Sequence, residues 1–123
     1  MPRYVLRYFF DPGSGTCLWS ANDEARERFE YAVELASLNL SENLLCEALY
    51  LLRWYDTSID WSYPPNPSPW SDEERSRFGK AAQSFLEKLR IFLGREFEIR
   101  DEMNHERSGV LPPNTSLERT RER

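Results

Sequence analysis

The sequence contains very little histidine and cysteine, and these shortages exclude several kinds of chemistry. His105 is the only histidine among 123 residues, and it lies in a charged C-terminal segment. A Ser-His-Asp or Cys-His site would therefore have no base within the part of the chain that is expected to fold. Zinc sites need clustered cysteine and histidine, whereas Cys17 and Cys46 are far apart in the sequence. We therefore expect no metal ion and no cofactor, and we assign no catalytic residue.

Long hydrophobic runs and an excess of basic charge are also absent. No apolar run approaches the roughly 18 residues of a membrane span. The first ten residues, interrupted by Arg7, lack the apolar region of about 7–15 residues that a secretory signal needs. The chain has 21 acidic and 16 basic residues, a net charge of -5, which argues against a general nucleic-acid binder. These features predict a cytoplasmic protein, in which both thiols stay reduced and largely buried.

The sequence does have enough apolar residues to build one hydrophobic core. Hydrophobic residues make up 40% of the chain and aromatic residues 14%. A chain of this length is typical of one domain, which we place at residues 1–103. From residue 104 the apolar periodicity stops and charged residues dominate, so we expect residues 104–123 to form a disordered tail.

Two segments near the N-terminus predict a β-hairpin. Apolar and aromatic residues alternate over residues 4–10, with Tyr4, Leu6 and Tyr8 on one face. Residues 11–15, Asp-Pro-Gly-Ser-Gly, suit a turn, and residues 17–20 can return as the second strand. This turn has no Gly-Lys-Ser/Thr ending, so we interpret it as a hairpin turn and not as a phosphate-binding loop.

Apolar residues at three- and four-residue spacing predict three helices after the hairpin. They are expected over residues 22–38, 41–55 and 71–94, with Asn22, Ser41 and Ser71 as N-caps. Glu74 completes a capping box with Ser71, and Gly94 suits the C-terminal end. The third helix has the strongest stripe, which we assign to the core: Phe78, Ala82, Phe85, Leu86, Leu89 and Phe92.

Residues 96–100 alternate between polar and apolar and predict a last strand. Strands at both ends with helices between them indicate an α+β fold. We predict a three-stranded antiparallel sheet, made of the N-terminal hairpin and the C-terminal strand, packed against three helices in the order ββαααβ. Three strands are about the minimum for an independently stable sheet.

The most unusual segment is residues 54–70. It holds three of the four tryptophans, two of the six tyrosines and four prolines. The prolines exclude a continuous helix. The residues in this segment that we consider candidates for binding are Trp54, Tyr55, Asp56, Asp60, Trp61 and Tyr63.

This aromatic loop has two interpretations, which can hold for different residues. It can cross over the helices while its tryptophans seal the core, or it can present aromatic anchors to a partner. We predict that Trp70, beside the capping Ser71, is structural and that Trp61 is an exposed anchor. The acidic neighbours Asp56 and Asp60 favour a basic partner.

An enzyme is the alternative. If the second helix continued far enough, Asp56 and Asp60 would lie on the same helix face. A carboxylate pair beside aromatic residues could serve a small-ligand or carbohydrate-processing enzyme. It could also bind a divalent cation.

Residues 111–123 resemble the tails of short bacterial proteins encoded in mobile, integron-type gene cassettes. That resemblance implies an accessory bacterial gene and no particular activity. Small size, acidity, the aromatic loop and the lack of histidine or cysteine chemistry together predict a protein that acts by binding another protein. The specific hypothesis is an immunity- or antitoxin-like protein that neutralises a basic bacterial toxin. The sequence does not determine the oligomeric state.

Overall fold

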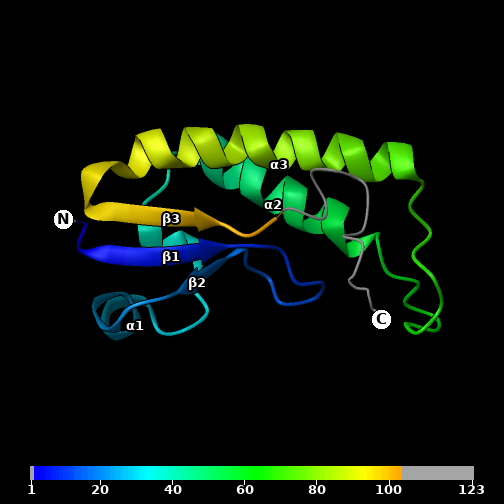
Figure 1. Cartoon of the computed structure of the whole chain (residues 1–123), viewed down its shortest axis with the longest axis horizontal. Helices are drawn as coiled ribbons and strands as arrows, with labels where there is room; N and C mark the ends of the chain where they lie inside the picture. The colour runs from blue at the N-terminus through cyan, green and yellow to red at the C-terminus, as the bar shows by residue number, and fades with distance from the viewer. Residues whose placement is uncertain (1, 104–123) are drawn as a thin grey trace.

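The computed structural model describes residues 2–103 of the chain (Figure 1). The predictions made for the tail at residues 104–123, including His105 and the cassette-like ending, lie outside the described residues. Within residues 2–103, no helix is long and apolar enough to cross a membrane.

The described chain forms the predicted α+β arrangement of strands and helices. In sequence order the elements are β1 (Tyr4–Tyr8), β2 (Leu18–Ser20), α1 (Asp23–Phe29), α2 (Glu42–Asp56), α3 (Asp72–Leu93) and β3 (Phe97–Asp101). Two short 3₁₀ turns add to the predicted order ββαααβ. Leu35–Leu38 lies between α1 and α2, and Gly94–Glu96 joins α3 to β3.

The sheet is mixed, so the prediction of an antiparallel sheet was wrong for its last strand. The strand order is β2-β1-β3, with β1 antiparallel to β2 and parallel to β3. After the hairpin the chain runs along the sheet with α2 and returns with α3, as Figure 1 shows. It therefore enters β3 at the end of the sheet where β1 begins, and the two strands run in the same direction.

The first helix is much shorter than the predicted span of residues 22–38. It ends at Phe29, and Glu30 follows with a positive φ of 65°. Ala32 then forms a bridge with Trp19, and the amide of Val33 donates to the carbonyl of Leu18. Backbone groups of Ala32 and Val33, which would bond within a longer helix, thus pair with the edge of β2. This tertiary pairing overrides the local helix pattern.

The three predicted N-caps are confirmed. Asn22, Ser41 and Ser71 each accept a hydrogen bond from the backbone amide three residues ahead. Only one hydrogen bond of the predicted capping box is present, the one that the Ser71 hydroxyl accepts from the amide of Glu74. The Glu74 carboxylate instead accepts from the indole N–H of Trp54 at 2.8 Å. This contact joins the beginning of α3 to the end of α2.

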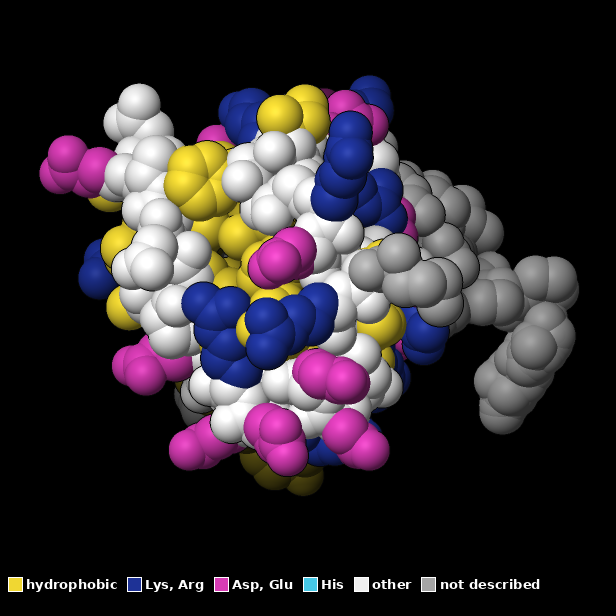
Figure 2. Space-filling model, turned by 90° about the vertical axis from the view of Figure 1, so that its left-hand side faces the viewer, with side chains coloured by type: hydrophobic (Ala, Val, Ile, Leu, Met, Phe, Trp, Pro, Cys, Tyr) yellow, Lys and Arg dark blue, Asp and Glu magenta, His cyan; other side chains and the backbone are white. Residues whose placement is uncertain are grey.

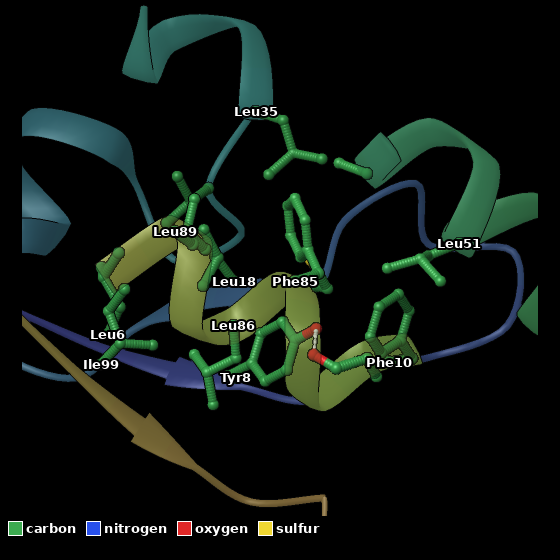
Figure 3. Close-up of a cluster of buried hydrophobic side chains, with 14 of the residues drawn as sticks. Leu6, Tyr8, Phe10, Leu18, Leu35, Leu51, Phe85, Leu86, Leu89 and Ile99 are labelled. Carbon is green, nitrogen blue, oxygen red and sulfur yellow. Dashed lines mark hydrogen bonds between the residues drawn. The ribbon is translucent and has the colours of Figure 1, made fainter. Parts of the chain in front are cut away.

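The core lies between one face of the sheet and helices α2 and α3 (Figure 3). Tyr8 shows how tightly it is closed, because its hydroxyl donates to the carbonyl of Ala82 at 2.8 Å and burial raises the pKa of the phenol. Phe85 is completely buried, as predicted. Phe92 was assigned to the core, but it is 46% exposed.

The two cysteines differ, which corrects the expectation that both thiols are largely buried. Cys17 is buried, and burial raises the pKa of its thiol to about 12. Cys46 is exposed on α2. Both are free thiols, as expected from the sequence.

Candidate binding surface

Four segments meet at one end of the molecule. They are the hairpin turn at residues 11–15, the last turn of α2, the aromatic loop, which spans residues 57–70 because α2 continues to Asp56, and the beginning of α3 (Figure 1). A hydrogen bond joins the turn to α2, and another joins α2 to α3. All six residues that the sequence singled out lie at this end, but the structure gives them three different positions.

Trp54 and Tyr55 contribute to the packing beneath the loop. Both are half-buried at the end of α2. The ring centroids of Trp54 and Tyr55 lie 5.1 and 5.2 Å from that of Phe78 on α3, and Tyr55 also contacts Phe10 at 5.5 Å. These contacts support the loop from inside and give the two side chains a structural role.

The two loop tryptophans occupy the environments that the sequence predicted. Trp70 is only 7% exposed, its indole N–H donates to the hydroxyl of Thr57 at 2.7 Å, and its ring lies 5.2 Å from that of Phe78. Trp61 is 56% exposed, and Tyr63, two residues further on, is 59% exposed. The loop therefore places one indole in the core and two aromatic rings in solvent.

The carboxylate of Asp56 accepts a hydrogen bond from the hairpin turn, and that of Asp60 accepts hydrogen bonds from its own loop. One oxygen of Asp56 accepts from the amide of Gly13 at 2.9 Å. Asp60 accepts from the side chain of Asn66 at 2.9 Å and from the amide and hydroxyl of Ser62. The hydrogen bond from Asn66, followed by that from Ser62, lowers the pKa of the Asp60 carboxyl.

This hydrogen bonding gives no support to the enzyme alternative. Glycoside hydrolysis needs one carboxyl group whose pKa is raised, so that it can act as an acid. The shift at Asp60 is in the opposite direction. A cation site gains no support either, since residues 2–103 contain no group of three or more His, Cys, Asp or Glu placed to hold a metal ion.

The charge at this end of the molecule is mainly negative, although Arg53 in the last turn of α2 and Arg75 in the first turn of α3 are basic. Asp11 in the hairpin turn and Asp72 at the beginning of α3 are exposed, and Asp60 in the aromatic loop is half-buried. Glu73 is also exposed, although its carboxylate pairs with Arg77 at 3.3 Å. A cationic surface would be attracted to this arrangement.

The opposite end is different, as Figure 2 shows, because dark-blue and magenta side chains lie side by side there. A shallow pocket of about 310 Å³ on this side is lined by Arg3, Tyr4, Glu24, Glu27 and Arg28. The guanidinium groups of Arg3 and Arg28 lie over the Tyr4 ring, 5.3 and 5.1 Å from its centroid. This end therefore has no single charge sign that would favour a basic partner.

Sequence reasoning missed an apolar groove between the beginning of α2 and the end of α3. Its volume is about 400 Å³, and it is lined by Asn43, Leu44, Glu47, Lys88, Ile91 and Phe92. Ile91 is 83% exposed. The signal in the sequence was Ile91 itself, an apolar residue that lies outside the predicted core stripe.

Comparison with known proteins adds one finding. The model of a family described as Serratia CdiI immunity protein-like matches residues 7–100, which include the hairpin turn, α2, the aromatic loop and α3. Neither a curated protein nor a solved structure matches the chain.

Proposed function

The chain belongs to the Serratia CdiI immunity protein-like family, and from this premise we propose that it is an immunity protein that neutralises a protein toxin by binding it. A cytoplasmic location, expected from the sequence, is part of the proposal. The family supports binding to a toxin in general. The surface that binds and the chemistry of the partner are proposed from the structure.

We assign the toxin-binding surface to the aromatic loop, and the exposure of Trp61 and Tyr63 carries this assignment. Large aromatic side chains are enriched among the residues that dominate binding energy at protein interfaces. Here two of them are more than half exposed and only two positions apart. The loop is held by prolines and internal hydrogen bonds, so it loses less conformational entropy when a partner binds.

The partner is a basic protein surface. Asp11 and Asp72 are exposed beside the aromatic loop, and residues 2–103 contribute more acidic than basic charge. Opposite charges on two partners increase the rate of association, and salt reduces that effect. We therefore expect association with the toxin to slow as the salt concentration rises.

Toxin neutralisation is tested by expressing the chain together with the product of the gene adjacent to its own. We expect this product to stop growth when it is expressed alone and growth to return when the chain is co-expressed. A neighbour that leaves growth unaffected, or whose effect the chain does not relieve, contradicts the proposed function.

The assignment of the surface is tested by titrating the same purified neighbour against variants of the chain. Trp61→Ala is expected to weaken binding by about 30-fold or more, as truncation of an aromatic hot spot does. The control is Ile91→Ser, which changes an even more exposed apolar residue in the groove between α2 and α3. If Ile91→Ser abolishes binding and Trp61→Ala does not, the surface lies at the groove and the assignment to the loop is wrong.

A further inference from the structure

Asp56 makes contacts with two segments that are distant from each other in the sequence. It is the last residue of α2. One carboxylate oxygen accepts from the amide of Gly13 in the hairpin turn at 2.9 Å. Its backbone carbonyl accepts from the indole N–H of Trp61 in the aromatic loop at 2.7 Å. One residue thus binds both the turn and the loop.

The turn and the loop also contact each other directly. Gly13 has a positive φ of 82°, and a Cβ atom added there would lie 3.4 Å from the outer edge of the Trp61 ring. The ring therefore lies against the backbone of the turn. Trp61 is 56% exposed, so much of its ring remains in solvent. Its N–H group is held by the hydrogen bond to the carbonyl of Asp56.

The position of Asp56 in its helix does not explain the carboxylate. Side chains with negative charge are unfavourable at a helix C-terminus, where the dipole is negative. Replacing Asp56 by a neutral residue should leave α2 as stable as before or slightly more stable. The favourable contact made by this carboxylate is the hydrogen bond from Gly13.

We propose that Asp56 is a positioning residue, which acts through its oxygen acceptor and not through its charge. It fixes the hairpin turn against the aromatic loop, so that Trp61 is held in a binding-competent orientation and residues 11–15 become part of the surface that meets the basic toxin. The part that concerns the toxin rests on the proposed function. The part that concerns the loop does not.

The orientation of Trp61 is tested without any toxin. The protein is labelled with 5-fluorotryptophan, and its ¹⁹F resonances are assigned by replacing each tryptophan with phenylalanine in turn. Asp56→Ala should shift and sharpen the Trp61 resonance and leave that of buried Trp70 unchanged, because the turn no longer holds the ring. Asp56→Asn keeps an oxygen acceptor and should give the parent spectrum. If the Trp61 resonance is the same in Asp56→Ala as in the parent, the positioning role is wrong.

Binding to the product of the adjacent gene separates positioning from charge. Loss of one net hydrogen bond corresponds to about a fivefold change in affinity, so we expect Asp56→Ala to bind about fivefold more weakly. Asp56→Asn should bind within twofold of the parent at every salt concentration. A salt-dependent loss in Asp56→Asn would show that the charge itself contacts the toxin and would overturn the proposal.

The two proposals can fail independently. If the Trp61 resonance changes as expected but no neighbour binds, the loop is positioned by Asp56 and the toxin-binding function is wrong. If a neighbour binds the parent and Asp56→Ala equally well, the function stands and the positioning role in binding is overturned. Urea unfolding of both variants serves as the control for folding. The midpoint of Asp56→Asn should match that of the parent, and that of Asp56→Ala should be lower by no more than about 0.7 M, the effect of one lost net hydrogen bond.

Discussion

Changing Trp70 or Trp61 to alanine should separate the structural side of the aromatic loop from its exposed side. The two residues lie nine positions apart in the same loop, and the same atoms are removed from each. Trp70 is 7% exposed and Trp61 is 56% exposed. The difference in the free energy of unfolding between the two variants therefore reports mainly on burial.

The size of each effect follows from the area that is removed from water. A tryptophan side chain offers about 200 Å², and burial contributes about 25 cal/mol per Å². Trp70→Ala then costs about 4.5 kcal/mol, in line with the roughly 3–5 kcal/mol found for large-to-small changes in cores. Trp61 is 56% exposed, so the same calculation gives about 2 kcal/mol for Trp61→Ala. This value is an upper bound, because an extended reference chain overstates the buried area. The expected difference is about 2.5 kcal/mol.

Equilibrium urea unfolding, followed by far-UV circular dichroism, measures this difference. With a dependence on urea of about 1.5 kcal/mol per molar, the two midpoints should differ by about 1.7 M. Circular dichroism is preferred to fluorescence because each variant lacks one of the fluorophores. Equal midpoints for the two variants would mean that Trp61 is as buried as Trp70, and the exposed aromatic surface proposed to bind the toxin would not exist.

Three other properties can be tested on the isolated protein. Phe85→Ala should lower the free energy of unfolding by about 3–5 kcal/mol because the ring is fully buried, and a urea midpoint equal to that of the parent would place Phe85 outside the core. The native protein should react rapidly with one equivalent of 5,5′-dithiobis(2-nitrobenzoic acid), at the exposed thiol of Cys46. Cys17 should not react, because it is buried and burial raises the pKa of its thiol to about 12. Rapid reaction of the Cys46→Ser variant would contradict this. The pKa of Asp60 is lowered by its hydrogen bonds from Asn66 and Ser62, so its contribution to loop order should be complete above pH 3.8 and be lost as the pH falls through the lower pKa of the folded state. A ¹³C NMR titration of the Asp60 carboxyl group checks this, and a midpoint at or above 3.8 would show that these hydrogen bonds do not form.

The sequence by itself determined the features that depend on a few neighbouring residues. Ser41 and Ser71 cap their helices as predicted, because an N-cap needs only its own side chain and the amides of the next turn. The exposure of Trp61 and the burial of Trp70 also followed from local context. Trp70 directly precedes a helix that packs on the core, whereas Trp61 lies between polar residues in a segment where prolines prevent a helix.

The direction of β3 was decided only by the tertiary structure. A first helix over residues 22–38 would have been about 25 Å long and would have added a third pass along the sheet. The last strand would then have run antiparallel to β1. Because α1 stops at Phe29, and the chain after it pairs with β2, only α2 and α3 make long passes and β3 runs parallel to β1. Pairing with a strand edge is a long-range contact, so the helix pattern of this segment did not reveal it.

The roles of the other candidate residues were likewise set by contacts that are distant in the sequence. Composition drew attention to Trp54, Tyr55, Asp56, Asp60, Trp61 and Tyr63 as one group. Apart from Trp61, it did not distinguish the residues that meet solvent from those that support the loop. The packing of α2 against α3 turned Trp54 and Tyr55 toward Phe78. A hydrogen bond across 43 positions of the chain joined Asp56 to Gly13. Residue types determined that this end of the molecule would be aromatic and acidic, but only the fold determined which side chains meet solvent and which hold them in place.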